Sequence, residues 1–239
     1  MRTRLRRLFD GLKKTPVHPQ WLVARNSEHS GTIFCRQFRG IVLDVGSGDR
    51  QLEKHLPAGT RYIGLDYPPS GTRYRARPHV WADAMQLPIR ADAVDGVALF
   101  EVLEHLPEPG LALKEAARVL RNGGAVVLTV PFLYPIHDAP FDFSRLTASQ
   151  LRHLAAEAGL DVVELNERGH ALETAAMLAC LSLAEACIRA IEQRRPMALV
   201  LLPFLLSVPV VNIAGYLLSR LFPVDRFMPA GYRAVLKKA

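Results

Sequence analysis

Ile41-Val42-Leu43-Asp44-Val45-Gly46-Ser47-Gly48 is the stretch of sequence that decides the fold. Its apolar residues end in a turn with two glycines, which is how a buried parallel strand opens into a loop that a ligand can approach closely. A second apolar run, Tyr62-Ile63-Gly64-Leu65, ends in Asp66. A carboxylate at the end of the second strand can accept hydrogen bonds from both hydroxyls of a ribose. Together the two runs predict a site for a cofactor that carries a nucleoside.

Two details of the glycine turn bear on the identity of the cofactor. A dinucleotide-binding turn has the form G-x-G-x-x-G and places a pyrophosphate at a helix N-terminus. This chain has Gln51 where the third glycine would stand. Asp44 faces the same crevice, where its negative charge suits a cationic amino-acid group and repels a pyrophosphate. The turn therefore argues against an NAD(P)-dependent oxidoreductase.

Five motifs along the chain, in the same order and spacing, resemble those of class I S-adenosylmethionine-dependent methyltransferases of the type-11 kind. They lie at residues 43–48, 64–66, 82–88, 100–106 and 118–124, within a resemblance that covers about residues 38 to 165. Arg50 departs from the pattern, because many members have a third glycine there. The resemblance implies S-adenosyl-L-methionine as the cofactor and methyl transfer as the activity.

The order of predicted elements indicates an α/β fold. Strands are predicted at 41–45, 61–65, 94–100, 125–130 and 161–166, and helices at 49–55, 110–120 and 147–158. This alternation predicts a mostly parallel sheet with helices on both faces. Asn122-Gly123-Gly124 predicts a turn before the strand at 125–130, Thr147 a helix start, and Gly159 a helix stop. The resemblance implies a Rossmann-like, seven-stranded sheet with an antiparallel last strand, which residues 231–238 match.

Length and composition predict one domain with an appendage. We divide the 239 residues into a basic N-terminal arm (1–37), a methyltransferase domain (38–170 and 230–239) and an apolar helical insertion (171–229). The three cysteines have no metal-ligand spacing, and their odd number favours free thiols in a reducing compartment. Cys180 and Cys187 lie on one face of a predicted helix, which favours core packing.

The net charge of +7 is concentrated at the N-terminus. Residues 1–40 hold nine Arg and Lys against two acidic residues, whereas the remainder holds 21 of each. In residues 1–14, apolar side chains at helical spacing alternate with six basic ones. This pattern predicts a basic amphipathic helix at an anionic membrane surface, with an ordinary capping helix as the alternative. A signal peptide is not expected, because the apolar stretch is too short.

The segment before the last strand has the composition of a membrane-associated element. Residues 197–219 carry no charge over 23 positions, long enough to span a bilayer. A single span would place strand 231–238 on the wrong side of the membrane. We therefore expect an apolar helical pair that lies on or dips into the membrane. The alternative is a lid or dimer interface of a soluble enzyme, with a homodimer formed through 171–222.

The resemblance assigns cofactor-binding roles to residues at the carboxyl ends of the first four strands. Asp44, Gly46 and Gly48 line the methionine end, Asp66 holds the ribose, Tyr67 lies beside the adenine, and Asp83 faces the adenine edge. Glu101 and Val102 line the side of the methyl donor. The full set is Asp44, Gly46, Ser47, Gly48, Asp66, Tyr67, Asp83, Ala84, Glu101 and Val102.

The loop from Pro131 to Arg145 is the predicted catalytic element, because it mixes ionisable side chains with aromatic residues and prolines at the carboxyl end of a strand. His137 is a candidate general base that Asp138 or Asp142 orients. Substrate-binding candidates are His105, Tyr134 and Arg145. A metal site from His137, Asp138 and Asp142 has few ligands, and no metal is expected. The alternative is a stiff lid whose charges pair with Arg145.

The sequence thus predicts a cytoplasmic enzyme, peripheral or monotopic on a membrane, that methylates a small-molecule, lipid or glycan-linked acceptor. One alternative is an RNA or protein methyltransferase that uses the basic arm. Another is a non-catalytic cofactor-binding scaffold with an apolar partner interface. Nucleic acid is the less favoured partner, because aromatic residues are not interleaved with the basic ones as a base-stacking surface requires.

Overall fold

The computed structural model describes residues 11–25, 35, 37–74, 76–193, 202–223 and 227–239. The chain divides into two compact units. The sheet unit comprises residues 30–132, 136–167 and 231–239, and the helical unit comprises 1–29, 133–135 and 168–230, each as far as it is described. The short piece 133–135 therefore belongs with the helices rather than with the rest of its loop.

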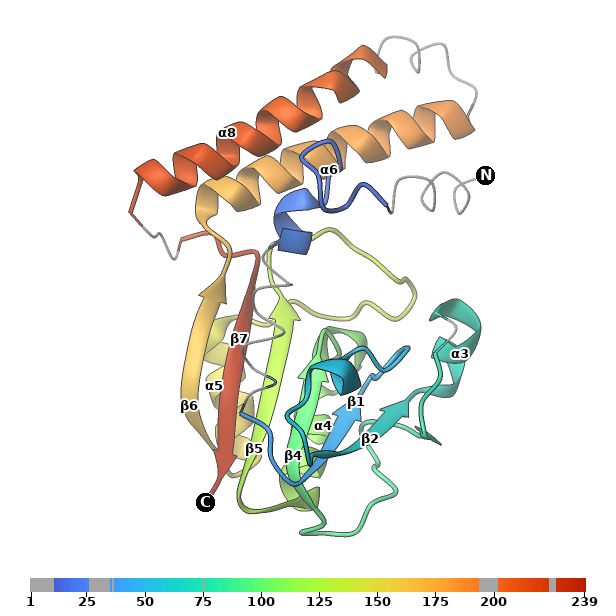
Figure 1. Ribbon diagram of the computed structural model, residues 1–239, viewed down its shortest axis with the longest axis vertical. Helices are drawn as coiled ribbons and strands as arrows, with labels where there is room; N and C mark the ends of the chain where they lie inside the picture. The colour runs from blue at the N-terminus through green and yellow to red at the C-terminus, as the bar shows by residue number, and fades with distance from the viewer. Residues whose placement is uncertain (1–10, 26–34, 36, 75, 194–201, 224–226) are drawn as a thin grey trace. The chain divides into compact units, whose positions relative to one another are not determined.

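A seven-stranded sheet forms the sheet unit, and its order is β3-β2-β1-β4-β5-β7-β6. Strands β1 to β5 pair in parallel, whereas β7 runs antiparallel to β5 (Figure 1). This topology confirms the predicted Rossmann-like fold. The strands are β1 (Ile41–Val45), β2 (Arg61–Asp66), β3 (Val80–Trp81), β4 (Val94–Phe100), β5 (Leu120–Pro131), β6 (Leu160–Arg168) and β7 (Gly231–Lys238).

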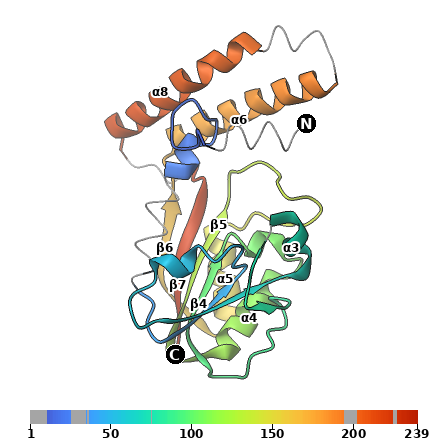
Figure 2. The same ribbon diagram turned by 45° about the vertical axis from the view of Figure 1, so that its right-hand side comes forward.

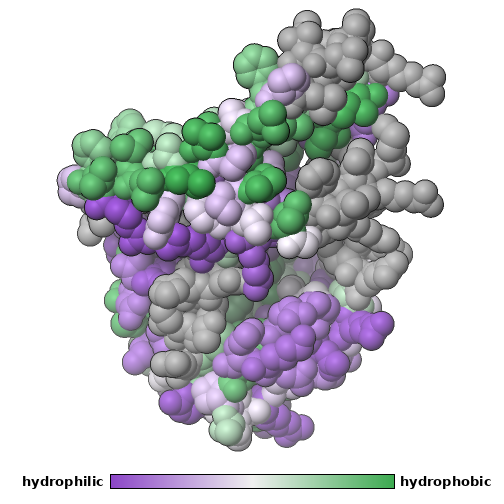
Figure 3. Space-filling view, turned by 45° about the horizontal axis from the view of Figure 1, so that its top comes forward, coloured by the Kyte–Doolittle hydropathy of each residue, from purple (hydrophilic) through white to green (hydrophobic). Residues whose placement is uncertain are grey.

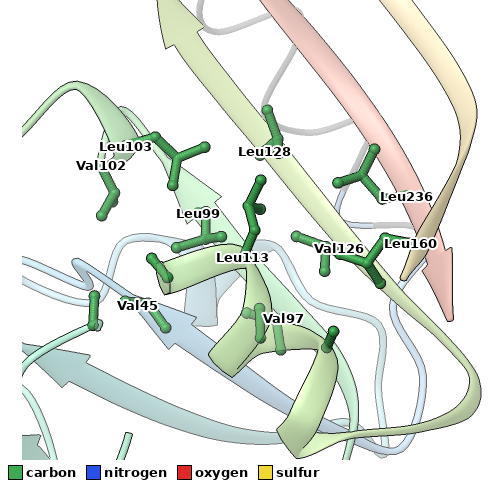
Figure 4. Close-up of a cluster of buried hydrophobic side chains, with 14 of the residues drawn as sticks. Val45, Val97, Leu99, Val102, Leu103, Leu113, Val126, Leu128, Leu160 and Leu236 are labelled. Atoms are coloured by element: carbon green, nitrogen blue, oxygen red, sulfur yellow. The ribbon is translucent and has the colours of Figure 1, made fainter. Parts of the chain in front are cut away.

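Alternation along the central strands divides the apolar core between the two faces of the sheet. Leu43, Val97 and Leu128 belong to the larger cluster, which the helices α4 (Pro109–Val119) and α5 (Ala148–Glu157) complete. Figure 4 shows Leu113 of α4 among the strand side chains of this cluster, and Figure 2 shows α4 and α5 near the same strands from a second side. Val42 and its neighbours form the smaller cluster on the other face. Period-two patterning thus fixes which residues face which layer.

The segment after β1 differs from its prediction. Instead of a helix over 49–55 there is only the 3-10 turn η1 (Leu52–His55). Gly48 and Arg50 have positive φ angles of 51° and 61°, which a right-handed helix does not accommodate. The departure at Arg50 thus shows in the backbone as a left-handed residue where the predicted helix would have begun.

One further element, β5, differs from expectation, and two others, α3 and β3, were not predicted. Strand β5 begins at Leu120, so Asn122-Gly123-Gly124 lies within the strand rather than in a turn before it. There Gly123 has φ +76°, and the pairing of β4 with β5 shifts register between Val94 and Gly96. The helix α3 (Pro68–Tyr74) and the two-residue strand β3 were too short or too proline-rich to show periodicity.

Two apolar helices dominate the helical unit: α6 (Ala171–Glu192) and α8 (Val208–Leu221), the latter preceded by the 3-10 segment η3 (Leu202–Ser207). They pack closely, because a Cβ added at Gly215 would come within 2.5 Å of the Ala176 Cβ. Cys180 and Cys187 are buried at 2% and 1% exposure, which confirms their predicted core packing. Residues 194–201, which include the first five positions of the predicted uncharged segment 197–219, lie outside the described residues.

Asn212 ties α8 to the segment that follows the N-terminus. Its side chain is fully buried, and its Nδ2 donates to the carbonyl oxygens of Pro16 and His18 at 2.7 and 3.0 Å. The Cys180 thiol lies 3.6 Å from Asn212 Oδ1. Asn212, a polar residue that would be unfavourable in a helix exposed to lipid, thus has its side-chain hydrogen bonds made within the protein.

The N-terminal arm is only partly described. Residues 1–10, which hold most of the predicted amphipathic helix, lie outside the described residues, and 11–14 form turns. Further along, Trp21 packs edge-on against Tyr216 of α8 at 5.8 Å between ring centroids. The Arg25 guanidinium lies 4.0 Å from the centroid of the same ring.

Both helical segments pass a length and hydropathy test for crossing a membrane: Ala171–Glu192 and Pro203–Leu221. The second is the more exposed: 17% of its most apolar 18-residue stretch is buried, compared with 39% for the first. Figure 3 shows hydrophobic residues gathered on the surface of this unit. Among the described residues from η3 onward, the exposed large apolar side chains of this unit are Phe204, Leu206, Val210, Ile213, Leu217, Leu218, Leu221, Phe222 and Phe227.

Candidate functional site: the carboxyl edge of the sheet

The glycine turn after β1 follows the backbone that its sequence requires. Gly46 has φ +75°, and a Cβ there would lie 2.5 Å from the Val102 Cγ2. The amides of Gly46 and Ser47 both donate to the Leu65 carbonyl, at 2.8 and 3.0 Å. A Cβ added at Gly48 would meet nothing within 4 Å, so open space lies beside this end of the turn. The turn is therefore held against the β2 and β4 ends and remains open on its other side.

Asp66 joins the end of β2 to the glycine turn. Its Oδ2 accepts a hydrogen bond from the Gly48 amide and its Oδ1 one from the Tyr67 amide, both at 2.7 Å. The residue is 6% exposed, whereas Tyr67 is 47% exposed. Each carboxylate oxygen has a second lone pair, so Asp66 can still accept from ribose hydroxyls.

Asp44 has a partner that the sequence did not reveal. The Tyr62 hydroxyl donates to Asp44 Oδ2 at 2.7 Å. Burial, with the neighbouring charge of Asp66, raises the pKa of the Asp44 carboxyl to about 7, although the Tyr62 bond opposes this. Gly64 stands opposite Asp44 in the sheet register, and a Cβ there would be 3.0 Å from the Tyr62 hydroxyl. Gly64 thus leaves room for the Tyr62 hydroxyl beside Asp44, an arrangement that depends on the pairing register of β1 and β2.

The remaining cofactor candidates follow β3 and β4 at the same edge. Asp83 Oδ1 accepts from the Met85 amide at 2.8 Å, and Ala84 is buried. Glu101 has a positive φ of 55°, and Val102 packs over the glycine turn. Because parallel strands end at one edge, all ten predicted cofactor residues lie at the ends of four adjacent strands.

A polar cluster lies directly after β4 and draws in the loop that follows β5. Glu104 and His105 belong to the 3-10 turn η2 (Leu103–His105). The rings of His105 and His137 meet edge-on with centroids 5.0 Å apart. Asp142 Oδ2 lies 3.4 Å from His137 Nδ1 and accepts from the His137 amide at 2.8 Å. Three of the predicted residues therefore do come together.

Arg145 pairs with Asp142 in a two-pronged contact, with Nη1 donating to Oδ1 at 2.5 Å and Nη2 to Oδ2 at 2.8 Å. These bonds and the His137 amide lower the pKa of Asp142 to about 2. The expectation that charges of the loop pair with Arg145 is thus confirmed for Asp142. Asp138 has φ +57°, and its carbonyl accepts from the Phe141 amide in a local turn.

Tyr134 belongs to the helical unit, where its hydroxyl accepts a hydrogen bond from Gln20 Nε2 at 2.7 Å. The structure thus groups it with the N-terminal segment rather than with His105 and Arg145.

Glu104 is a residue whose importance the sequence did not reveal. It is fully buried, yet neither carboxyl oxygen has a hydrogen-bond partner among the described residues. Burial and the charge of Glu101 raise its pKa to about 8. The loop after β5 packs against it, and the amides of Phe143 and Ser144 donate to its backbone carbonyl at 2.9 and 3.3 Å.

A separate hollow of about 490 Å³ lies at the opposite end of the strands. It is lined by Arg39, Arg121, Lys237 and the glycines of β5, with Asp95 paired to Arg121 at 2.7 Å. It shares no lining residue with the glycine turn, so we do not assign the cofactor there.

The residues at the carboxyl edge fit S-adenosylmethionine. The open space beside Gly48 admits a ligand next to exposed backbone. The Asp44 carboxyl, buried against a second acid, is stabilised as an anion by a cation such as a sulfonium or ammonium group. Asp66 has acceptor capacity left for a ribose.

Comparison with known proteins bears directly on this site. Residues 43–128 match the family model described as "Methyltransferase domain", type 11. An uncharacterized methyltransferase of Mycobacterium leprae is 38% identical over 109 residues, covering 42% of this chain and 39% of its own. A "probable S-adenosylmethionine-dependent methyltransferase" of Mycolicibacterium smegmatis is 33% identical over 133 residues, covering 51% and 52%. The chain thus spans about two-fifths to half the length of these relatives.

Solved structures share the fold at low identity. An S-adenosylmethionine-dependent methyltransferase of Archaeoglobus fulgidus superposes with a TM-score of 0.54 at 16% identity, covering 97% of this chain and 99% of its own. The [4+2]-cyclase SpnF superposes equally well, with a TM-score of 0.54 at 16% identity, covering 89% and 81%. This likeness establishes the fold, and the reaction has to be argued from the site.

Proposed function

Because the chain carries a methyltransferase domain of the S-adenosylmethionine-dependent class, we propose that the protein methylates a small or lipid-linked acceptor at a membrane surface. The observation that supports methyl transfer is that the glycine turn, Asp44 and Asp66 lie together at the carboxyl edge of the sheet. S-adenosylmethionine supplies a methyl group that its positive sulfur already activates.

The chain's own residues hold the cofactor, orient the acceptor and exclude water. Asp44 provides the anion for the cationic end, and Asp66 provides acceptors for the ribose. Val102, packed over Gly46, places the segment after β4 beside the glycine turn. Alignment of the acceptor behind the methyl group is the main requirement, since positioning alone can contribute about 7–11 kcal/mol to lowering a barrier.

The acceptor lies against the polar cluster in this proposal. Glu104, His105 and His137 are ionisable groups that follow β4 and β5 at the carboxyl edge and lie close to one another. A base is needed only if the acceptor loses a proton, as a hydroxyl does. His137, held by Asp142, is the candidate for that role.

Cofactor binding is tested by calorimetric titration of the full chain with S-adenosylhomocysteine. Asp66→Ala removes the proposed ribose acceptor, and Asp161→Ala, at an exposed position of β6, is the matched control. We expect binding to the wild type and the control, and at least tenfold weaker binding to Asp66→Ala. Folded wild-type protein that does not bind would overturn the assignment.

The acceptor class is tested by radiolabelled methyl transfer into a membrane extract, partitioned afterwards into organic and aqueous phases. Label in the organic phase supports a lipid or lipid-linked acceptor. Label confined to RNA or protein would favour the alternative enzymes, and no label with intact cofactor binding would favour the scaffold.

The exposed apolar residues of η3 and α8 support the membrane part of the proposal. Leu206, Val210, Ile213, Leu217 and Leu221 recur at helical spacing, and each is 43–78% exposed. Such a stripe on a helix is typical of an element that lies in the membrane interface. The basic residues of 1–14 add attraction to anionic lipid, worth about 1 kcal/mol for each one near the surface.

Sedimentation with anionic vesicles tests this stripe. Val210→Ser with Leu217→Ser should reduce vesicle binding several-fold, whereas Val163→Ser with Leu111→Ser, equally conservative at exposed positions of the sheet unit, should not. If neither pair matters, and light scattering shows a dimer that Val210→Ser with Leu217→Ser dissociates, the surface is a protein interface instead.

A further inference from the structure

Three side chains that could ligate a metal gather beside the glycine turn. Glu104, His105 and His137 each present one ligand atom, and these atoms all lie within 4.8 Å of one another. Glu104 and His105 are adjacent in η2, whereas His137 arrives from the loop after β5. Val102, two residues before Glu104, packs over Gly46, so the group lies next to the proposed cofactor site.

The Glu104 carboxyl points to a missing positive partner. It is fully buried, and neither oxygen has a hydrogen-bond partner among the described residues. Glu101 and Asp142 add negative charge nearby, and Arg145, the cation that acts on it, is bonded to Asp142 through both Nη atoms. A buried acid without partners destabilises the protein unless a cation or a proton neutralises it.

The two imidazoles are oriented as metal ligands usually are. His105 Nδ1 lies 2.6 Å from the Phe141 carbonyl oxygen, and a hydrogen bond to a carbonyl requires the proton on Nδ1. Its Nε2 is then the electron-pair donor, and it lies 3.7 Å from Glu104 Oε1. His137 Nδ1 lies 3.4 Å from Asp142 Oδ2 and 3.5 Å from Arg145 Nη2, which itself donates to Asp142. Ligating histidines commonly direct their other nitrogen at a carbonyl or carboxylate in this way.

We propose that Glu104, His105 and His137 form a binding site for a divalent first-row transition-metal ion. Two imidazoles and one carboxylate suit such ions better than Mg²⁺ or Ca²⁺, which prefer oxygen ligands. With bonds of about 2.0–2.2 Å, neighbouring ligands of a tetrahedral ion lie about 3.3 Å apart. The Glu104–His105 separation of 3.7 Å needs only a small closure. Three protein ligands leave coordination positions open.

The open positions select the acceptor, and this step rests on the proposed function. A ligand completing the coordination shell would have to offer an oxygen or nitrogen with a lone pair, so the site favours hydroxyl-bearing acceptors over carbon acceptors. In this arrangement His137 is a ligand through Nε2 rather than the general base. The sequence offered His137, Asp138 and Asp142 as ligands, but Asp142 is bonded to Arg145 instead.

Cobalt(II) binding tests the site without any turnover. The full chain is stripped with EDTA and titrated with Co²⁺, whose visible absorption reports ligation by nitrogen and oxygen. We expect saturable binding to the wild type and at least tenfold weaker binding to Glu104→Gln and His137→Ala. His153→Ala, an exposed histidine of α5 near Glu157, is the control and should bind as the wild type does.

The same samples are titrated with S-adenosylhomocysteine, so the two proposals fail separately. Cofactor binding without a saturable cobalt spectrum overturns the metal site alone. A cobalt spectrum without cofactor binding overturns the methyltransferase assignment alone. Equal loss of cobalt binding in His153→Ala and His137→Ala would also overturn the site, because it would indicate adventitious surface binding. Glu104→Gln preserves side-chain volume, and circular dichroism verifies that each variant is folded.

Discussion

Asp44→Asn should make the ligand-free protein more stable and a poorer binder of cofactor. The Asp44 carboxyl is 4% exposed, and burial raises its pKa from 3.8 to about 7. A folded-state pKa above the unfolded one means that the folded state holds the proton more tightly. Stability from this group is therefore greatest below about pH 4 and is lost as pH rises to about 7.

The size of the effect follows from that difference. The step from 3.8 to about 7 corresponds to about 4 kcal/mol of destabilisation once the carboxyl is ionised in both states. At pH 5 the folded group is still protonated, and less than half of that penalty is present. Asparagine has no such titration. We expect the stabilisation by Asp44→Asn to be about 2 to 3 kcal/mol larger at pH 8 than at pH 5.

Urea denaturation of both proteins at pH 5 and pH 8, without ligand, measures the difference. Calorimetry with S-adenosylmethionine, which is cationic, should show at least tenfold weaker binding to Asp44→Asn at pH 8. A stability change that is the same at both pH values would refute the buried-acid reasoning. Asp161→Asn, at an exposed position, should change neither quantity.

Three further predictions concern stability. Gly46→Ala should destabilise the folded protein by about 1 to 3 kcal/mol, because φ is +75° and the new Cβ would lie 2.5 Å from the Val102 side chain. Thermal denaturation measures the loss. Gly59→Ala is the control that isolates the clash, because Gly59 also has a positive φ but its Cβ would meet nothing within 4 Å. Asp142→Asn should lower the free energy of unfolding by about 2 kcal/mol at neutral pH. In the wild type, the stabilisation by the Asp142 carboxylate is fully present above about pH 4 and should disappear as pH falls through about 2. Urea denaturation of both proteins over this pH range measures the difference. Asn212→Ala should lose about 2 to 4 kcal/mol in urea denaturation, because the carbonyls of Pro16 and His18 lose their donor; a change below 1 kcal/mol would contradict this account.

Local patterns were sufficient for the central sheet. Strands β1, β2 and β4 are short apolar runs with sharp ends, and β7 could be placed by its resemblance to a closing strand. The segment after Gly48 was misread because periodicity does not report backbone angles, and the left-handed Arg50 is incompatible with a helix over 49–55. The extent of β5 was misread because a glycine pair usually ends a strand, whereas here it forms an irregularity within one.

The site was less accessible to sequence reasoning than the fold. The glycine turn and Asp66 could be placed because each follows a strand directly. The Tyr62 contact with Asp44 depends on the register of two strands, and the burial of Glu104 depends on a loop about 40 residues further along the chain. Contacts of that kind come from tertiary packing, for which a single sequence carries no local signal.

The two ends of the segment 168–230 are joined to each other: the Ala230 amide donates a hydrogen bond to the Arg168 carbonyl oxygen at 2.8 Å. In order of synthesis, β6 leaves the ribosome about 60 residues before β7, the strand through which it joins the sheet. At about 5 to 20 residues per second, this delay lasts about 3 to 12 s. During that interval β5 has an unpaired edge, and the apolar helices emerge before the sheet can close. A nascent chain would therefore have time to meet a membrane or a chaperone while its last strand is still being made.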